Sequence, residues 1–283
     1  MISPTKLWFL LWIAILSTSI LGETTGDHFT QVLVKREGRS WSGKSATSLQ
    51  PFKIQKMSFG RTNYQFASDP LKGNEKVLKI FYPKGSRTPS SPGKQGGLGF
   101  YAKPLSLQDE VTLEYKVFFP RGFDFVKGGK LPGIYGGSPD CPNGNDKRKC
   151  FTTRFMFRTG GDGEIYAYLP MNQVAGYCKT NICNPTYGDS LARGSFKLTT
   201  GKWHTLRQSI RLNDVGKQNG VLRVWANGKL VINYRNVVYR NQRNVKNIGL
   251  IFHTFFGGST PSYRSTKDQY SYFKHFQMFD YAK

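Results

Sequence analysis

The chain is 283 residues long and carries 41 Lys and Arg residues against 17 Asp and Glu residues, a formal net charge of +24 at pH 7. So large a positive charge predicts a polyanionic partner. Because the basic residues are spread along the whole chain, the pattern argues against a disordered tail that binds nucleic acid. The length permits either one large all-β domain or two small domains.

The N-terminal residues have the pattern of a secretory signal peptide. Lys6 is the one early charge, residues 7–16 are apolar, and mostly small residues follow up to Gly22. The apolar run is too short to span a membrane, and no later segment is long enough either. We therefore expect residues 1–22 to be removed. The mature protein is expected to be secreted to the extracellular space as a soluble monomer, with no membrane or nucleic-acid partner.

The four cysteines fall into two local pairs, Cys141 with Cys150 and Cys178 with Cys183. In a secreted chain two disulfides are the default, and local pairing is favoured among the three possible connectivities. A four-cysteine zinc site is the alternative, but neither pair has CxxC spacing. We therefore expect two disulfides and no metal.

Short strand patterns dominate the rest of the chain, taken in order. Residues 23–50 are polar around Trp41 and form either a lead-in segment or an edge strand, and residues 83–97 have the composition of a surface loop. Alternating apolar and polar residues, several of them aromatic or β-branched, predict strands at residues 77–82, 111–119, 151–158, 164–169, 203–212, 221–226, 229–234, 248–256 and 270–279.

No amphipathic helix of ten or more residues and no internal repeat accompanies these strand patterns. Many strands separated by Gly and Pro turns indicate a sandwich of two antiparallel sheets. We therefore expect residues 51–283 to form a single all-β domain, preceded by a polar lead-in at residues 23–50.

The clearest strand pattern is a β-hairpin within residues 151–169, whose two strands flank a five-residue glycine-rich loop. Placing Arg158 opposite Glu164 sets the register and puts Arg154 opposite Tyr168. Because side chains two apart in a strand share a face, the hairpin divides into two faces. The apolar face carries Phe151, Phe155, Phe157, Ile165 and Leu169, and the polar face carries Thr152, Arg154, Tyr166 and Tyr168. The polar face is either an ordinary solvated surface or a binding site.

Further motifs resemble known sugar-binding proteins. Trp203-His204 before a strand, followed by a hairpin around Asn227-Gly228, resembles the pattern of concanavalin-like jelly rolls, whose concave sheet often binds sugar chains. The Lys-Leu-Pro-Gly motif within residues 129–137, the hairpin, and the motif of residues 253–258 ahead of another strand together resemble polysaccharide lyase family 14. This resemblance covers roughly residues 100–280. It implies a β-jelly roll with a substrate cleft on one concave sheet.

The resemblance to family 14, which contains molluscan alginate lyases and a chlorovirus enzyme acting on a glucuronate-rich polysaccharide, also implies site residues. Carried over motif by motif, the catalytic residues are Lys130, Arg154, Tyr166 and Tyr168. Thr152 stands where the family has a serine. This departure keeps a hydroxyl donor and acceptor.

The implied chemistry is cleavage of a uronate chain by β-elimination, with no cofactor. The C5 proton is only weakly acidic while the adjacent carboxylate is charged, so Arg154, Lys130 and Thr152 are expected to neutralise that carboxylate. A base then takes the C5 proton and an acid protonates the leaving O4. A tyrosine, its pKa lowered by Arg154 and Lys130, is expected to act as the base or as both base and acid. The sequence leaves Tyr166 and Tyr168 open, and the predicted register favours Tyr168.

Three further residues are candidates for substrate binding. His253 lies either at the rim of the cleft or packed among aromatic residues. Arg207 and Arg211 share a face of their strand and either extend the basic cleft or lie on a solvated outer face. Loops 138–150 and 171–190 contain the cysteine pairs, so we expect the disulfides to brace the walls of the cleft.

Two functions of different classes remain open from the sequence. The first is a secreted lyase of an acidic polyuronate, with mannuronate-rich alginate as the expected substrate. The second is a non-catalytic secreted jelly-roll protein that binds anionic polysaccharide. The exchange of serine for Thr152 and the high basicity support the second.

Overall fold

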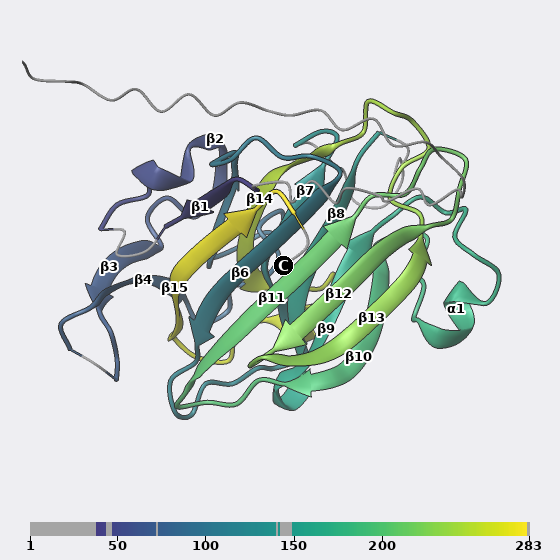
Figure 1. Cartoon of the computed structure of the whole chain (residues 1–283). Coiled ribbons are helices and arrows are strands. Elements are labelled where there is room, and N and C mark those ends of the chain that lie inside the picture. The colour runs from purple at the N-terminus through teal and green to yellow at the C-terminus, as the bar shows by residue number, and fades with distance from the viewer. Residues whose placement is uncertain (1–37, 44–46, 72, 140, 142–148, 282–283) are drawn as a thin grey trace, which may run out of the picture. The chain divides into compact units, whose positions relative to one another are not determined.

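The structure is a computed structural model with two antiparallel β-sheets packed face to face as two layers (Figure 1). Sheet A has the strand order β13-β12-β11-β6-β15-β4-β3, with β1 also paired to β15. Sheet B has the order β10-β9-β8-β7-β14-β5-β2. The described residues are 38–43, 47–71, 73–139, 141 and 149–281.

The strands are mostly five to eleven residues long, and one short α-helix, α1 (Tyr177–Thr180), lies between β9 and β10. The bounds of the strands are β1 Ser40–Ser42, β2 Ile54–Phe59, β3 Tyr64–Ser68, β4 Lys76–Tyr82, β5 Leu98–Ala102, β6 Glu110–Phe118, β7 Gly128–Gly136, β8 Phe151–Arg158, β9 Asp162–Tyr168, β10 Asp189–Lys197, β11 Trp203–Arg211, β12 Gly220–Ala226, β13 Lys229–Val237, β14 Asn247–Phe256 and β15 Gln269–Phe279. The 3₁₀ turns are η1 Gln50–Phe52, η2 Thr159–Gly161 and η3 Pro261–Tyr263.

Alternating side chains explain why the two sheets stack. In β6, four alternate side chains are fully buried between the sheets: Val111, Leu113, Tyr115 and Val117. The even-numbered positions of the strand, beginning with Glu110, point outward. The apolar face predicted for the hairpin is buried in the same core. The expected all-β sandwich of two antiparallel sheets is therefore confirmed.

Hydrogen bonds cross the core between the two sheets. Buried polar groups need partners, and these partners come from the opposite sheet. Three side chains of sheet A reach sheet B in this way: Tyr82 bonds to Thr254 Oγ1 (2.5 Å), Tyr115 donates to the Pro132 carbonyl (3.1 Å), and Gln208 accepts from Thr153 Oγ1 (2.8 Å). The contacts fix β14, β7 and β8 against the other layer.

The register of the β8–β9 hairpin differs from the prediction by two residues. Arg154 lies opposite Tyr166, and Tyr168 lies opposite Thr152. The connection is shorter than expected, because β9 already begins at Asp162 and only the turn η2 separates the strands. A shift of two residues keeps every side chain on its predicted face, since the side-chain period of a strand is two.

The segments before β2 are only partly described. β1 forms an edge strand on β15, and Trp41 packs edge-on against Phe52 at 5.3 Å between ring centroids. The predicted signal peptide, residues 1–22, lies outside the described residues. Within the described residues, no helix is both long and apolar enough to cross a membrane.

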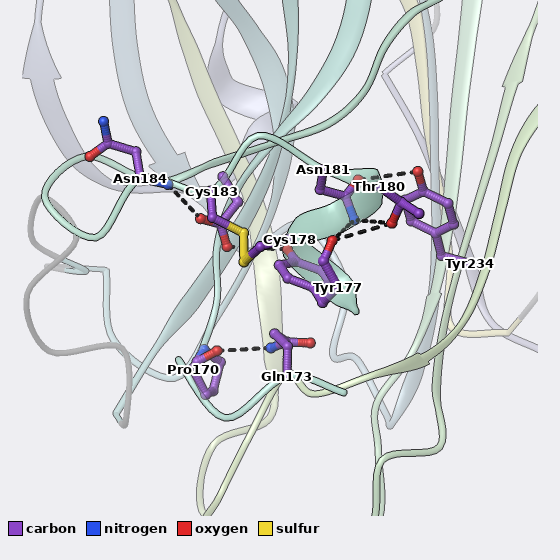
Figure 2. Close-up of a disulfide and its surroundings, with 10 residues drawn as sticks. Pro170, Gln173, Tyr177, Cys178, Thr180, Asn181, Cys183, Asn184 and Tyr234 are labelled. Atoms are coloured by element: carbon purple, nitrogen blue, oxygen red, sulfur yellow. Dashed lines mark hydrogen bonds between the residues drawn. A yellow bond between two sulfur atoms is a disulfide. The ribbon is translucent and has the colours of Figure 1, made fainter. Parts of the chain in front are cut away.

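The predicted pairing of the cysteines is confirmed, with disulfides Cys141–Cys150 and Cys178–Cys183. The first packs against Tyr168. The second closes the segment around α1 (Figure 2).

The α1 segment is held at the edge of the sandwich from both sides. Tyr234 of β13 donates to Asn181 Oδ1 (3.1 Å), as Figure 2 shows, and Tyr177 donates to Asp189 Oδ2 of β10 (3.1 Å). The segment therefore links the edge strand of sheet A to the edge strand of sheet B.

The link between Thr153 and Gln208 generates a test of the core. Thr153→Val removes the hydroxyl and leaves the buried Gln208 amide without its donor, so the free energy of unfolding should fall by about 1–3 kcal/mol. Urea denaturation measures the change. As a control, Thr186→Val alters an exposed threonine and should stay within about 0.5 kcal/mol. Equal stabilities of the two variants would contradict a role for the cross-core bond.

Candidate active site

Polar side chains gather on the outer face of sheet B, the face turned away from the core. The structure brings together here all four predicted catalytic residues, together with Thr152 and His253. The residues come from adjacent strands: Lys130 from β7, Thr152, Arg154 and Arg158 from β8, Glu164, Tyr166 and Tyr168 from β9, and His253 from β14. We call this set the cationic face.

A β-bulge in β7 directs Lys130 onto the cationic face. Lys130 lies opposite Met156, whereas Gly133 lies opposite Arg154, so β7 has one extra residue between the two pairs. Without the bulge, residues 130 and 133 would point to opposite sides of the sheet. Pro132 occupies the bulge, where a missing N–H is tolerated, and its carbonyl accepts the hydrogen bond from Tyr115.

Lys130 is buried among aromatic and cationic groups. Its Nζ lies 3.3 Å from the centroid of the Tyr166 ring and 3.1 Å from Met156 Sδ. Burial, together with the guanidinium groups of Arg154 and Arg158, lowers the pKa of the Lys130 ammonium well below its ordinary value. Both effects disfavour the charged ammonium relative to the neutral amine.

Arg154 lies at the centre of the face. Its guanidinium lies 4.7 Å from the centroid of the Tyr168 ring, a cation–π contact that fixes the plane of the group. Arg154 exposes 4% of its surface and Thr152 exposes 1%. Both side chains are therefore almost completely buried on this face.

Several buried polar atoms of the cationic face have no hydrogen-bond partner among the described residues. These atoms are Thr152 Oγ1, Arg154 Nε, Arg154 Nη2, Arg158 Nε and His253 Nε2. Buried donors in proteins are almost always paired. Unpaired donors concentrated on one face are the arrangement expected where an anionic, oxygen-rich ligand completes the hydrogen bonds.

Tyr166 differs from the sequence expectation. Burial and the neighbouring Tyr168 raise the pKa of the Tyr166 phenol, and this effect outweighs the opposing one of Arg154 and Arg158. The prediction that cations would lower the pKa is therefore wrong for Tyr166, because desolvation of the phenolate is the larger effect. The corrected register also removes the reason for favouring Tyr168.

The sequence did not assign a role to Glu164, which is fully buried on the same face. Its carboxylate pairs with Arg158 (2.5 Å) and Arg193 (2.8 Å) and accepts a short hydrogen bond from Ser190. Glu164 and Arg158 fall within the alternating pattern of the hairpin, so spacing could have placed both. Arg193 lies within an irregular stretch of β10, between Leu191 and Phe196, where the register with β9 shifts, and no sequence pattern marks it.

His253 lies among aromatic rings at the other side of the cationic face. The ring centroids of Phe59 and Tyr101 are 5.4 and 5.2 Å from the His253 ring. Burial, with a smaller contribution from Arg154, lowers the pKa of His253 well below its ordinary value. The imidazole is therefore a neutral hydrogen-bonding group.

Arg207 and Arg211 do not extend this face. Both lie on β11 of sheet A and point outward, on the far side of the sandwich. Arg207 is paired with Glu114 at 2.6 Å. The expectation that they lengthen the cleft is wrong, because shared strand spacing does not reveal which sheet a strand joins.

The described residues contain no group of three or more His, Cys, Asp or Glu side chains that could hold a metal ion.

Glu164 can be tested as the counter-charge of the cationic face. Glu164→Gln should lower the free energy of unfolding by about 3–5 kcal/mol, because it leaves Arg158 and Arg193 without their buried partner. Denaturant unfolding measures the loss. Asp162→Asn, in the same strand, breaks an exposed pair with Lys197 and should cost about 0–1 kcal/mol. If both variants lost the same small amount, the buried carboxylate would not have the role assigned to it.

Comparison with known proteins places this geometry in a family. The crystal structure of the marine PL-14 alginate lyase from Aplysia kurodai is 35% identical, covers 84% of this chain and 97% of that chain, and superposes with a TM-score of 0.74. Alginate lyase vAL-1 from Chlorella virus is 24% identical, with coverages of 82% and 94% and a TM-score of 0.69.

A curated relative and a family match complete the comparison. Exolysin of Paramecium bursaria Chlorella virus 1 is 26% identical in an alignment of 200 positions that covers 60% of this chain and 29% of that protein. The chain thus spans under a third of this relative. The family "Polysaccharide lyase 14" matches residues 70–276. The resemblance seen in the sequence is confirmed, and the chain belongs to the polysaccharide lyase 14 family.

Proposed function

We propose that this protein is a secreted polysaccharide lyase that cleaves alginate, preferentially its mannuronate-rich parts, by β-elimination to give unsaturated uronate ends. The observation that carries the proposal is the set of buried, unpaired donors on the cationic face. A polyuronate supplies a carboxylate and several hydroxyl oxygens per sugar, which match these donors. The 35% identity to the Aplysia kurodai alginate lyase supports the same substrate class.

In this proposal, Arg154 binds the carboxylate at C5 of the sugar. Its Nε and Nη2 are the unpaired edge of the guanidinium and can bind two carboxylate oxygens at once. Thr152 Oγ1 and His253 Nε2 add hydrogen bonds from either side. Neutralising this carboxylate makes the C5 proton acidic enough to remove, because negative charge then spreads into the carboxylate as the C–H bond breaks.

The proposed acid is Tyr166 and the proposed base is Lys130, and the pKa values of both are shifted. Tyr166 has a raised pKa, so its phenol stays protonated and can give its proton to the leaving O4. Lys130 has a lowered pKa, so its neutral amine can accept the C5 proton. Lys130 Nζ lies 3.3 Å from the centroid of the Tyr166 ring, and this proximity supports a base and an acid that act on the same sugar unit. Tyr168 holds the Arg154 guanidinium through the ring contact and acts as a positioning residue.

Secretion fits the rest of the molecule. Two disulfides are typical of an oxidising compartment, and the N-terminal sequence has the signal-peptide pattern. The net charge of +24 favours an anionic polymer as the partner. We expect the enzyme to act as a monomer on extracellular polysaccharide.

The first test is product formation. The protein should release products with the ultraviolet absorbance of an unsaturated uronate from polymannuronate, more slowly from polyguluronate, and more slowly still from glucuronan. Absence of absorbance with every polymer, alongside intact binding to alginate, would instead support the non-catalytic binding protein.

A second test separates the role of Lys130 as base from a role as fixed charge. Lys130→Arg keeps the positive charge but not the basic amine, so kcat/KM should fall roughly 10²- to 10⁴-fold. In the parent, kcat/KM should rise with pH through the lowered pKa of Lys130 and then level off, because only the neutral amine accepts a proton. The rise should be absent in the variant. A variant with parental activity would exclude Lys130 as the base.

A third test concerns the tyrosines. Tyr166→Phe removes the proposed acid and should lower kcat by roughly 10²- to 10⁴-fold. Tyr168→Phe keeps the aromatic ring under Arg154 and should cost much less. Steady-state rates on polymannuronate measure both, and the opposite ranking would reassign the acid to Tyr168.

A further inference from the structure

The outer face of sheet A, on the opposite side of the sandwich from the cationic face, contains a hollow of about 370 Å³. Most of its lining residues come from β11, β12 and β13, at the end of the sheet where β6 begins. Figure 1 shows these strands side by side. The residues that line it are Glu110, Ser209, Arg211, Asn219, Val221, Arg223, Arg235 and Asn236. The volume is in the range of sites that hold small ligands or one to two sugar units.

Positive charge is concentrated in this hollow. The described lining has three arginines and one carboxylate, Glu110. Arg211 and Arg235 flank Val221 on either side in the same row of the sheet, and Arg223 is two residues further along β12. Like charges on neighbouring strands are unfavourable unless something neutralises them.

The three arginines of the lining differ in their hydrogen bonds to the described residues. Arg211 donates to the Asn219 carbonyl (3.2 Å). Within the described residues, neither Arg223 nor Arg235 makes a side-chain hydrogen bond or ion pair. Their guanidinium groups therefore remain available for bidentate binding of an anion.

The backbone of β13 has a bulge beside the hollow. β13 has an extra residue between Val237, which lies opposite Gly220, and Arg235, which lies opposite Val221. The extra residue is Asn236, with a left-handed φ of 69°, a conformation that asparagine tolerates better than most residues. Bulges of this kind re-aim side chains beside binding sites, and this one brings the Asn236 amide to the rim next to Arg235.

The neutral lining and its surroundings suit a sugar. Ser209, Asn219 and Asn236 offer hydroxyl and amide groups, which can pair with sugar hydroxyls. The half-buried Trp225 lies two residues from Arg223 on the same face of β12, with the Arg207 guanidinium 5.8 Å from its ring. An indole beside a cationic hollow offers an apolar surface for the C–H face of a sugar ring.

We propose that this hollow is a second, non-catalytic binding site for carboxylated polysaccharide, in which Arg223 and Arg235 bind uronate carboxylates. The choice of polyuronate as ligand rests on the proposed function. Nucleic acid is the alternative polyanion, and the experiment below distinguishes the two. A site behind the cleft would hold the enzyme on the polymer between cleavage events and raise the local concentration of substrate.

The test compares two double variants of the full chain. Arg223→Gln with Arg235→Gln removes the two unengaged arginines. Arg121→Gln with Lys229→Gln removes the same charge from exposed positions at the far end of sheet A, in the turn after β6 and at the first residue of β13. Binding to long polymannuronate is measured by affinity electrophoresis in a Tyr166→Phe background, in which cleavage is expected to be slow. The kcat/KM is measured on a mannuronate tetrasaccharide in the parental background.

The hollow variant should bind the long polymer about tenfold more weakly, with kcat/KM on the tetrasaccharide unchanged. The control variant should bind within about twofold of the parent. Equal losses of affinity in both variants would show that overall charge, and not the hollow, determines binding. Unchanged polymer binding in the hollow variant would overturn the site. Displacement of the polymer by double-stranded DNA as effective as by free polymannuronate would overturn the ligand class. If the parent formed no unsaturated product, the proposed function would fail, but the binding comparison would still decide the second site.

Discussion

The cationic face depends on the ion pairs made by the buried carboxylate of Glu164. Lys130 and Arg154 are almost completely buried on one face of sheet B, with Arg158 and the partly exposed Arg193 beside them. Like charges repel one another more strongly where water is partly excluded. Glu164 is fully buried and binds two of the guanidinium groups, which leaves Arg154 oriented but unneutralised. The protein thus stabilises part of the positive charge and leaves the rest for a substrate carboxylate.

The core of the sandwich sets the geometry of that face. Leu131 is fully buried beneath the sheet while Lys130, its neighbour, points outward, and the carbonyl of Pro132 is fixed by Tyr115 from the opposite layer. The bulge in β7 is therefore held from the core side. A side chain on a bulge supported in this way has little freedom, and the role proposed for Lys130 requires such precise placement beside Arg154.

Much of this arrangement follows from alternation in the sequence. The division of the hairpin into an apolar and a polar face survived an error of two residues in register, because a two-residue shift leaves the faces unchanged. Positions that depend on long-range pairing were not predictable. The assignment of β11 to sheet A, which separates Arg207 from the cleft, results from its pairing with β6, about 90 residues earlier in the chain. Arg193 reaches Glu164 only through an irregularity in β10, and the pKa of Tyr166 depends on burial that spacing does not encode.

Thr152, the departure from the serine of the family motif, is consistent with this design. It is almost completely buried in β8 and its hydroxyl has no partner among the described residues. A β-branched side chain suits a strand and has a restricted χ1 rotamer, so the added methyl group limits rotation of the hydroxyl. The hydroxyl retains the donor and acceptor capacity of serine. The exchange therefore preserves the group that a carboxylate would meet beside Arg154, and the cleft gains rigidity without losing a hydrogen bond.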